Sequence, residues 1–425
     1  MSINSNNKSP YNFLVDKWDN KYDSIICNPP YNKFQVLDDR EYIFSDIEKH
    51  LKIKISGYCN QYVLFLMKCI YLLNNNGRLA FIVPNEFLNT GYGTCVKKYL
   101  LDNKCLQAII SFDNNVSVFD KALTTCCILL IEKTNNKDVL FSKLTSPEEL
   151  DYYDKNNCKI ISYHDLDPKT KWGKYFENDN VSYKNLIHLS NVAKVKRGIA
   201  TGSNEFFILN ESKRKELKLT ISNLNFCASK CSDFKSPIFN EIELNKMIKN
   251  DKNIYLFDGS KNQSISSKKY IEYGERIGVN KKFLTSHRNP WYSCENKAPS
   301  PIWINVFSRN HLKVVRNKVN ILNLTTFHSV YMNNGFDDLV DILFCYLLTP
   351  VGQEILYLNK RQYGDGLDKF EPNDLNNAQI LNLSIISEED KTEILKIYGS
   401  LNETKAFDVY LEALNKIFLK YLKSN

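Results

Sequence analysis

Glycine is scarce in this sequence, with 15 residues among 425, and the first of them is Gly57. The residues before Gly57 therefore cannot form a glycine-rich loop of the kind that holds a nucleotide or its phosphates. Long apolar runs are also missing, since no stretch approaches the roughly 18 consecutive apolar residues of a membrane helix. The polar opening Met1–Pro10 does not resemble a signal peptide. We expect a cytoplasmic protein without a membrane partner.

Cysteine spacing typical of metal sites is absent as well. The 12 cysteines are scattered, and no two are arranged as Cys-x-x-Cys. Cys126 and Cys127 lie in an apolar run that fits a core, whereas Cys227 and Cys231 have no second ligand pair at zinc spacing. We expect reduced thiols, as in a cytosolic protein, and no metal site.

The composition that is present is typical of a globular protein, with 43% apolar and 24% charged residues. A chain of 425 residues is long enough for two or three domains. The net charge of +8 is uneven, because residues 1–150 hold 17 Lys and Arg against 16 Asp and Glu. Nearly all of the excess therefore lies in the rest of the chain, where a basic bias permits a polyanionic partner but does not prove one.

The N-terminal third alternates between strand and helix patterns. Apolar runs bounded by turn residues predict strands, and apolar residues at three- and four-residue spacing predict helices. Near-continuous apolar strands separated by helices indicate an open α/β fold whose sheet is covered on both faces. The expected elements are strands at Asp23–Cys27, Arg78–Val83, Leu106–Phe112 and Thr124–Glu132, and helices at Tyr58–Leu73 and Thr94–Leu101.

The tetrapeptide Asn28-Pro29-Pro30-Tyr31 directly follows the first expected strand. An exocyclic amino group on a ring is a poor nucleophile, and two acceptors that hold its hydrogens can turn its lone pair toward a methyl donor. The Asn28 side-chain carbonyl and the Pro29 backbone carbonyl suit this task, because proline fixes φ and removes a competing donor. Tyr31 offers a flat face on which a base can stack. The same residues also suit an ordinary turn after a strand.

With this tetrapeptide and the segments that follow it, the chain resembles the gamma-class adenine-N6 DNA methyltransferases of restriction-modification systems. The resemblance rests on Asn28–Tyr31, on Gly77–Leu88 and on Val118–Thr124, in that order. It implies a partial Rossmann-like class I methyltransferase sheet, S-adenosylmethionine as the cofactor and a flipped adenine as the substrate. Phe119 matches the family's phenylalanine that stacks on the flipped base opposite the tyrosine.

The C-terminal part resembles the family's target-recognition domain. Its matching segments are Val195–Ile208, Lys281–Arg288 and Tyr363–Leu375. We expect a catalytic part over 1–145, a connecting segment over 146–185, an α+β target-recognition domain over 186–386 and a helical tail over 387–425. Basic residues can neutralise phosphates of double-stranded DNA, and glycines allow the backbone to approach it. The expected DNA-binding residues are Lys196, Arg197, Gly198, Thr201, Gly202, Lys281, Lys282, Arg288 and Arg361.

The family's cofactor loop has no counterpart in this sequence, nor does its ribose-binding acidic residue. Asn12-Phe13-Leu14 resembles the family's Asp-Phe-Leu stretch, in which the acidic residue binds the cofactor adenine and the phenylalanine packs on it. The resemblance thus implies that Asn12, Phe13, Asn28 and Pro30 contact the cofactor. Three alternatives explain the missing half of the cofactor site. In the first, a second subunit carries the glycine-rich loop; in the second, the chain is truncated; in the third, it is a DNA-binding specificity subunit or remnant without catalysis.

A further alternative keeps the catalytic tetrapeptide but changes the substrate. Enzymes that methylate a glutamine side chain or a base in ribosomal RNA also carry Asn-Pro-Pro-Tyr. Those enzymes are compact, with little chain after the catalytic domain, whereas here a long basic part follows Leu186. This length and the loop at Gly198 favour DNA.

Overall fold

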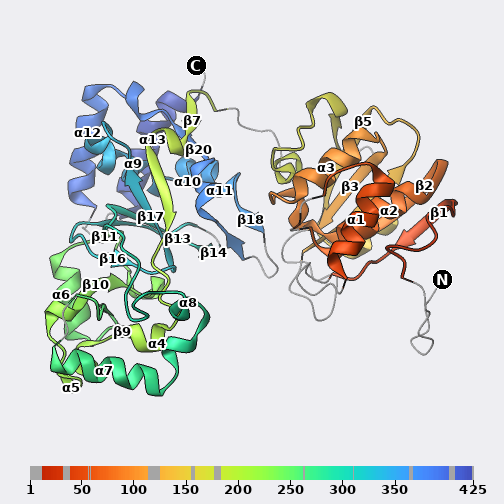
Figure 1. Ribbon diagram of the computed structural model, residues 1–425. Helices are drawn as coiled ribbons and strands as arrows, with labels where there is room; N and C mark the ends of the chain where they lie inside the picture. Colours follow the sequence, from red (N-terminus) through yellow and green to blue (C-terminus); the bar gives the residue numbers. More distant parts are fainter. Residues whose placement is uncertain are drawn as a thin grey trace. The chain divides into compact units, whose positions relative to one another are not determined.

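The computed structural model describes residues 12–31, 39–55, 57, 59–112, 125–154, 158–176, 183–261, 264–309, 311–362, 367–401 and 407–423. The chain divides into two compact units (Figure 1). Unit 1 comprises Met1–Asn180 with Arg361–Asp368, and unit 2 comprises Val181–Lys360 with Lys369–Asn425.

Unit 1 is built on a mixed six-stranded sheet with the order β1-β2-β4-β3-β5-β6. β1 runs parallel to β2, β4 runs antiparallel to both of its neighbours, and β3 runs parallel to β5. β1 therefore forms one edge of the sheet. The strands are β1 (Tyr22–Cys27), β2 (Leu73–Pro84), β3 (Leu106–Phe112), β4 (Cys126–Glu132), β5 (Asp138–Leu144) and β6 (Lys159–Ser162).

One face of this sheet is covered by α1 (Arg40–Leu51), α2 (Gln61–Leu72) and α3 (Gly93–Asp102), which enclose the main core of unit 1. Alternate residues of β2 and β4 enter this core, as expected for strands whose side chains point to opposite faces in turn. On the other face, Ile82 and Ile128 are only half-buried beside a much smaller cluster. The sequence predicted a sheet covered on both faces, but the described residues cover the two faces unequally.

All six elements expected from the sequence in unit 1 are present, with ends shifted by a few residues. The helix α1 and the strands β5 and β6 were not predicted. The segment 146–185, expected to be a connection, contributes β6 to the sheet and contains short 3-10 turns at Pro147–Tyr152, Tyr163–Asp165 and Trp172–Phe176. Trp172 is fully buried in the core, so the described residues of this segment up to Phe176 are part of unit 1.

Unit 2 is an α+β structure with several small sheets. A five-stranded sheet has the order β11-β15-β13-β17-β8, a four-stranded sheet has the order β16-β10-β12-β9, and β20 pairs with β7. These strands are β7 (Leu186–His188), β8 (Ala193–Arg197), β9 (Ile208–Leu209), β10 (Leu224–Ala228), β11 (Ile238–Phe239), β12 (Tyr255–Phe257), β13 (Ile302–Asn305), β15 (Val314–Asn317), β16 (Leu322–Asn323), β17 (Phe327–Met332) and β20 (Gln379–Leu381). The remaining short strands are β14 (Phe307–Ser308) in unit 2, β18 (Arg361–Gln362) in unit 1 and β19 (Asp368–Lys369), which contains a boundary between the two units.

The helices of unit 2 fall into two groups, each with its own core. The first group is α4 (Asn204–Phe207), α5 (Glu211–Glu216), α6 (Glu241–Lys249), α7 (Ile265–Arg276) and α8 (Phe283–Ser286). The second is α9 (Val340–Leu348), α10 (Pro350–Tyr357), α11 (Pro372–Asn376), α12 (Glu388–Ser400) and α13 (Phe407–Leu422).

The expected helical tail forms α12 and α13. The helix α12 begins after Ser387, whose side chain accepts a hydrogen bond from Asp390 N. Both helices pack on the buried helix α9.

Within the described residues, no single helix has both the length and the apolar composition needed to cross a membrane. The pair Asp337–Leu348 and Pro350–Tyr357 meets both criteria jointly, but it is bent by 82°. Ile342–Leu347 and Ile355 lie buried in the core of unit 2, which accounts for their apolar character.

Candidate active site and nucleic-acid interface

The tetrapeptide Asn28–Tyr31 leaves the sheet at the carboxyl end of the edge strand β1. Because β1 and β2 are parallel, with Cys27 opposite Phe81, the carboxyl ends of both strands lie at the same end of the sheet. Pro29 is buried, which anchors the turn, whereas Asn28 is exposed. The Asn28 amide is therefore held on a fixed turn and remains accessible to a substrate.

Tyr31 is tied to the neighbouring strand. Its hydroxyl donates a hydrogen bond to the Ile82 carbonyl oxygen at 3.3 Å, and its ring meets the Tyr62 ring edge-on at a centroid distance of 6.4 Å. Burial raises the pKa of the Tyr31 phenol, so the hydroxyl stays a neutral donor at physiological pH. These two contacts orient a half-buried aromatic ring beside Asn28.

The end of β2 meets the start of β4 at the same side of the sheet, since Pro84 lies opposite Cys126. The Thr125 hydroxyl donates to Asn85 Oδ1 at 2.6 Å, and Asn85 N donates to the Thr125 carbonyl oxygen at 3.1 Å. The chain therefore enters β4 on the side where Asn28–Tyr31 leaves β1. Phe119, the expected second stacking residue, lies outside the described residues.

The segment predicted to contact the cofactor adenine folds against α2. The Phe13 ring stacks on Phe65 at a centroid distance of 5.0 Å with an interplanar angle of 22°, and it remains partly exposed. Asn12 is exposed, and its side-chain oxygen accepts a hydrogen bond from Leu14 N at 3.1 Å. Phe13 is thus held by Phe65 on one ring face, and its contact with the cofactor remains a prediction.

A buried lysine that the sequence analysis did not single out holds this segment. Lys68 on α2 donates to the Asp16 carbonyl oxygen at 2.6 Å, and its ammonium lies 3.9 Å from the Trp18 ring centroid and 5.3 Å from that of Phe13. Burial lowers the pKa of Lys68 to about 8. Nothing in the local sequence of α2 marks this lysine, because its partners are about 50 residues away in the chain.

The outer side of β1 is open in the part of the chain that the structure describes, where this strand pairs with β2 alone. Ile26 is 90% exposed on this strand, and its neighbour across the ladder is Ala80. A free strand edge next to an exposed isoleucine is a surface that other proteins normally pair or cover. The tetrapeptide Asn28–Tyr31 directly follows this surface in the chain.

In unit 2, the predicted DNA-binding loop from Lys196 to Gly202 is tightly packed. A β-carbon at Gly198 would collide with the Leu324 carbonyl oxygen, and Gly202 has a positive φ of 81°. The Thr201 side chain is buried and donates to Asn204 Oδ1 at 2.5 Å. Thus Gly198 and Gly202 are required by the loop itself, and Thr201 stabilises the loop from inside.

The arginines near this loop have protein partners. Arg288 donates to the carbonyl oxygens of Ala200 and Thr201, the latter at 2.9 Å. Arg197 contacts Glu295 at 3.3 Å but keeps 54% of its side chain exposed. Arg288 therefore supports the loop, whereas the Arg197 guanidinium still faces solvent, where a phosphate could reach it.

The expected lysines differ in the same way. Lys196, Lys281 and Lys282 are all exposed, but Lys282 donates to the Ser203 hydroxyl at 2.8 Å. The Lys196 ammonium lies 5.4 Å from the centroid of the Tyr331 ring. Arg361 opens β18, and its side chain lies outside the described residues. As DNA contacts, all these residues remain predictions.

Over most of its length the chain matches the restriction-modification methylases. Residues 2–119 match the Eco57I restriction-modification methylase family, and residues 178–419 match the C-terminal domain of Type II methyltransferase M.Eco57I. Type II methyltransferase M.AccI from Acinetobacter calcoaceticus is 42% identical over 422 residues, which is 95% of this chain and 78% of M.AccI. The chain belongs to this family of Type II restriction-modification methyltransferases.

One more distant relative agrees with this assignment. Type II methyltransferase M.XamI from Xanthomonas campestris pv. amaranthicola is 23% identical over 85% of this chain and 67% of its own length. Among solved structures, the Type IIL restriction-modification enzyme MmeI in complex with DNA has a TM-score of 0.59 at 10% identity, covering 95% of this chain. The chain spans 55% of the MmeI chain, and this likeness concerns the fold alone.

Proposed function

We propose that this protein transfers a methyl group from S-adenosylmethionine to N6 of an adenine that has been flipped out of DNA, as part of a restriction-modification system. The observation that carries the proposal is the position of Asn28–Tyr31. The exposed Asn28 amide follows a parallel strand, and Tyr31 is held beside it by the hydrogen bond to Ile82. Membership of the methyltransferase family supports the same reaction.

The chemistry assigned to the turn is the activation of an amino group. The Asn28 side-chain carbonyl and the Pro29 backbone carbonyl accept the two amino hydrogens, so that the nitrogen lone pair points away from the ring plane. Both groups are pure acceptors, and buried Pro29 keeps them in a fixed relation. Tyr31 stacks on the base, and its hydroxyl is kept from competing because it is engaged with Ile82.

The residues on one side of the expected cofactor site fit S-adenosylmethionine. The Phe13 ring is backed by Phe65 and partly exposed, which suits packing against an adenine ring. Asn12 keeps an amide next to it for a hydrogen bond to that ring. The cofactor would supply the methyl group at Asn28. The residues described here offer no glycine-rich loop for the amino acid and ribose parts.

A second chain that carries the glycine-rich half of the cofactor site completes the proposal. Two features support it: among the described residues β1 pairs with β2 alone, and Ile26 is 90% exposed. An added strand would pair with β1 and cover this side chain. Such a strand would lie directly before the catalytic turn. The partner would therefore complete the sheet and the cofactor site at the same place.

Double-stranded DNA is the proposed substrate of the assembled enzyme. In unit 2, the exposed side chains of Lys196, Arg197 and Lys281 provide positive charge, and the tightly packed loop around Gly198 holds the first two in place. Contacts of this kind set the position of DNA without reading its sequence.

The decisive experiment is to co-express this chain with the product of the neighbouring gene and to map N6-methyladenine in the host genome. We expect methylation at one short sequence. A preparation that binds DNA with sequence preference yet never methylates adenine would instead identify a specificity subunit without catalysis.

Asn28→Ala is the first variant to test in this assay. Because it removes one of two acceptors at the reacting nitrogen, we expect the methylation rate to fall by about 10²-fold or more, by analogy with the loss of one oxyanion-hole group. DNA affinity should change by less than about twofold, since Asn28 is exposed and outside unit 2. Full methylation by this variant would refute the assigned role.

A further inference from the structure

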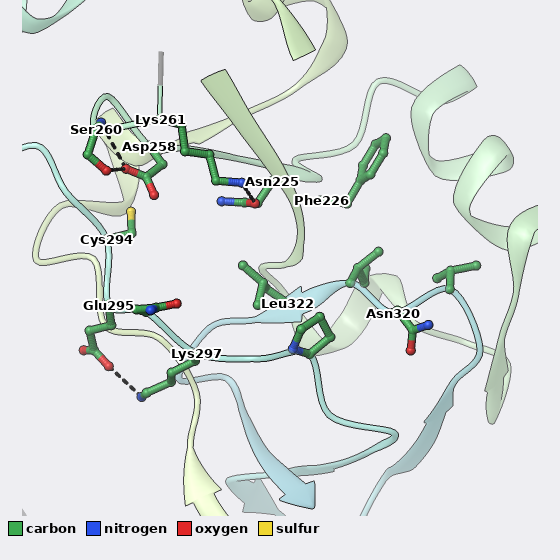
Figure 2. Close-up of a pocket in the computed structure, with 14 residues that line it drawn as sticks. Asn225, Phe226, Asp258, Ser260, Lys261, Cys294, Glu295, Lys297, Asn320 and Leu322 are labelled. Carbon is green, nitrogen blue, oxygen red and sulfur yellow. Dashed lines mark hydrogen bonds and ion pairs between the residues drawn. The ribbon is translucent and has the colours of Figure 1, made fainter. Parts of the chain in front are cut away.

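Unit 2 contains a polar pocket of about 520 Å³ that no sequence motif predicted (Figure 2). Four separate segments line it, namely β10, the turn after β12, residues 294–299 and residues 319–322. Its volume is in the range of sites that hold small ligands. A single nucleobase with its sugar is a ligand of this size class.

The polar groups in the pocket suit a neutral, hydrogen-bonding ligand. Lys261 donates to Asn225 Oδ1, which leaves the Asn225 amide nitrogen and the other ammonium hydrogens as donors. Asp258 adds an acceptor, whose Oδ1 is held by the Ser260 hydroxyl at 2.6 Å. Donors and acceptors thus stand side by side, as they do on the edge of a nucleobase.

The charges of the pocket do not favour an anion. Lys297 contacts Glu295 at 2.6 Å, and both line the pocket. Burial raises the pKa of Glu295, but the hydrogen bond from Lys297 and the nearby Arg197 outweigh it, so the net pKa is lowered and the pair is ionised. The charges of Glu295 and Lys297 cancel, and the charge of Asp258 offsets that of Lys261. A phosphate would therefore gain little electrostatic attraction in this pocket.

The pocket is directly connected to the predicted DNA-binding loop. Glu295 accepts hydrogen bonds from Ala200 N at 3.2 Å and from Arg197 at 3.3 Å. Lys297 donates to the carbonyl oxygens of Arg197 at 2.8 Å and Gly198 at 3.1 Å. A DNA strand whose phosphates contact Arg197 would therefore pass next to the pocket.

We propose that this pocket receives one nucleobase of the bound DNA, held out of the base stack, and that Lys261 and Asn225 read its edge. The proposal rests on DNA being the substrate, as argued above. The base enters a neutral, hydrogen-bonding pocket while the adjoining basic loop holds the backbone, and Lys and Asn are residue types that discriminate between bases. It is a second base-holding site, in a different unit from Asn28.

The test uses duplexes that carry the methylated sequence, with 2-aminopurine placed at each position in turn, and the co-expressed enzyme. This base analogue brightens when it leaves the stack. We expect two bright positions, the target adenine and a second base. In Lys261→Met and in Asn225→Ala the second position should fall to the brightness of free duplex, while the target adenine stays bright.

Preference for the specific over a scrambled duplex should fall by about fivefold or more in both variants. Lys269→Met, an exposed lysine on α7 that does not line the pocket, is the matched control and should change neither signal. One bright position alone, or a second one that survives both substitutions, would overturn the pocket while leaving the methyltransferase intact. If the unmodified enzyme gave no bright position and no preference for the specific duplex, both the pocket proposal and the proposed methyltransferase function would be overturned.

Discussion

At the scale of single residues, unit 1 contains a lysine whose burial makes stability depend on pH. Lys97 on α3 is 2% exposed and donates to the carbonyl oxygens of Leu88 at 3.2 Å and Thr170 at 2.6 Å. Burial lowers its pKa from 10.5 to about 8. Between these values the unfolded chain holds the proton and the folded chain does not, so stability rises with pH in this window and is flat below it.

We predict that Lys97→Met removes this contribution. The free energy of unfolding, measured in urea, should rise with pH more steeply in the parent chain than in the variant. The difference in slope should be at most about 1.4 kcal/mol per pH unit between about pH 8 and 10.5. Lys98→Met, the next residue on the same helix and exposed, should keep the parental slope. Parallel pH profiles for Lys97→Met and the parent would contradict the assignment.

At the scale of elements, the edge strand β1 is the feature with the clearest consequence. Ile26→Ser changes a side chain that is 90% exposed, so the isolated chain should keep its stability within about 0.5 kcal/mol. Co-purification with the proposed second subunit should drop at least several-fold, because the exposed apolar surface next to the edge of β1 is lost.

The matched control for Ile26 lies on the far edge of the same sheet. Ile160 on β6 is 62% exposed, and Ile160→Ser should leave assembly unchanged. Quantitative pull-down of the co-expressed partner measures both variants. Equal recovery with Ile26→Ser and the parent would show that the partner does not cover β1.

The loop that follows β8 allows a second element-scale prediction. Gly198→Ala would force a β-carbon against the Leu324 carbonyl oxygen, which should cost unit 2 about 1–3 kcal/mol and weaken DNA binding. Gly399→Ala, in α12 with open space around it, should instead add about 0.5–1 kcal/mol. Thermal unfolding of the two variants checks the contrast, and a neutral Gly198→Ala would contradict the close approach.

The sequence predicted elements better than it predicted their contacts. The apolar runs at Leu106–Phe112 and Thr124–Glu132 were recognised because strand periodicity is local. The segment 159–162 was missed because only pairing with β5 makes it a strand. Likewise Asn28 stands out in a motif, whereas Lys68 and Lys261 gain their roles from residues far away in the chain, which no local pattern reveals.

At the scale of the whole molecule, the chain combines two units, and the described residues of the first offer only one side of the proposed cofactor site. Phe13 and Asn12 can meet an adenine ring, but the described residues supply no loop for the remainder of the ligand. We predict that the purified chain alone binds S-adenosylmethionine weakly or not at all. Calorimetry checks this, and low-micromolar affinity of the chain alone would refute it, whereas the co-expressed preparation should bind.

The open outer side of β1 also bears on how the protein behaves while it is being made. Unpaired strand edges are templates on which identical chains stack into aggregates, and Ile26 adds an adhesive apolar side chain next to this edge. Over-production of this chain without the proposed partner should therefore fill inclusion bodies or occupy chaperones. Assembly would then act as quality control, because only copies that find their partner in time escape precipitation.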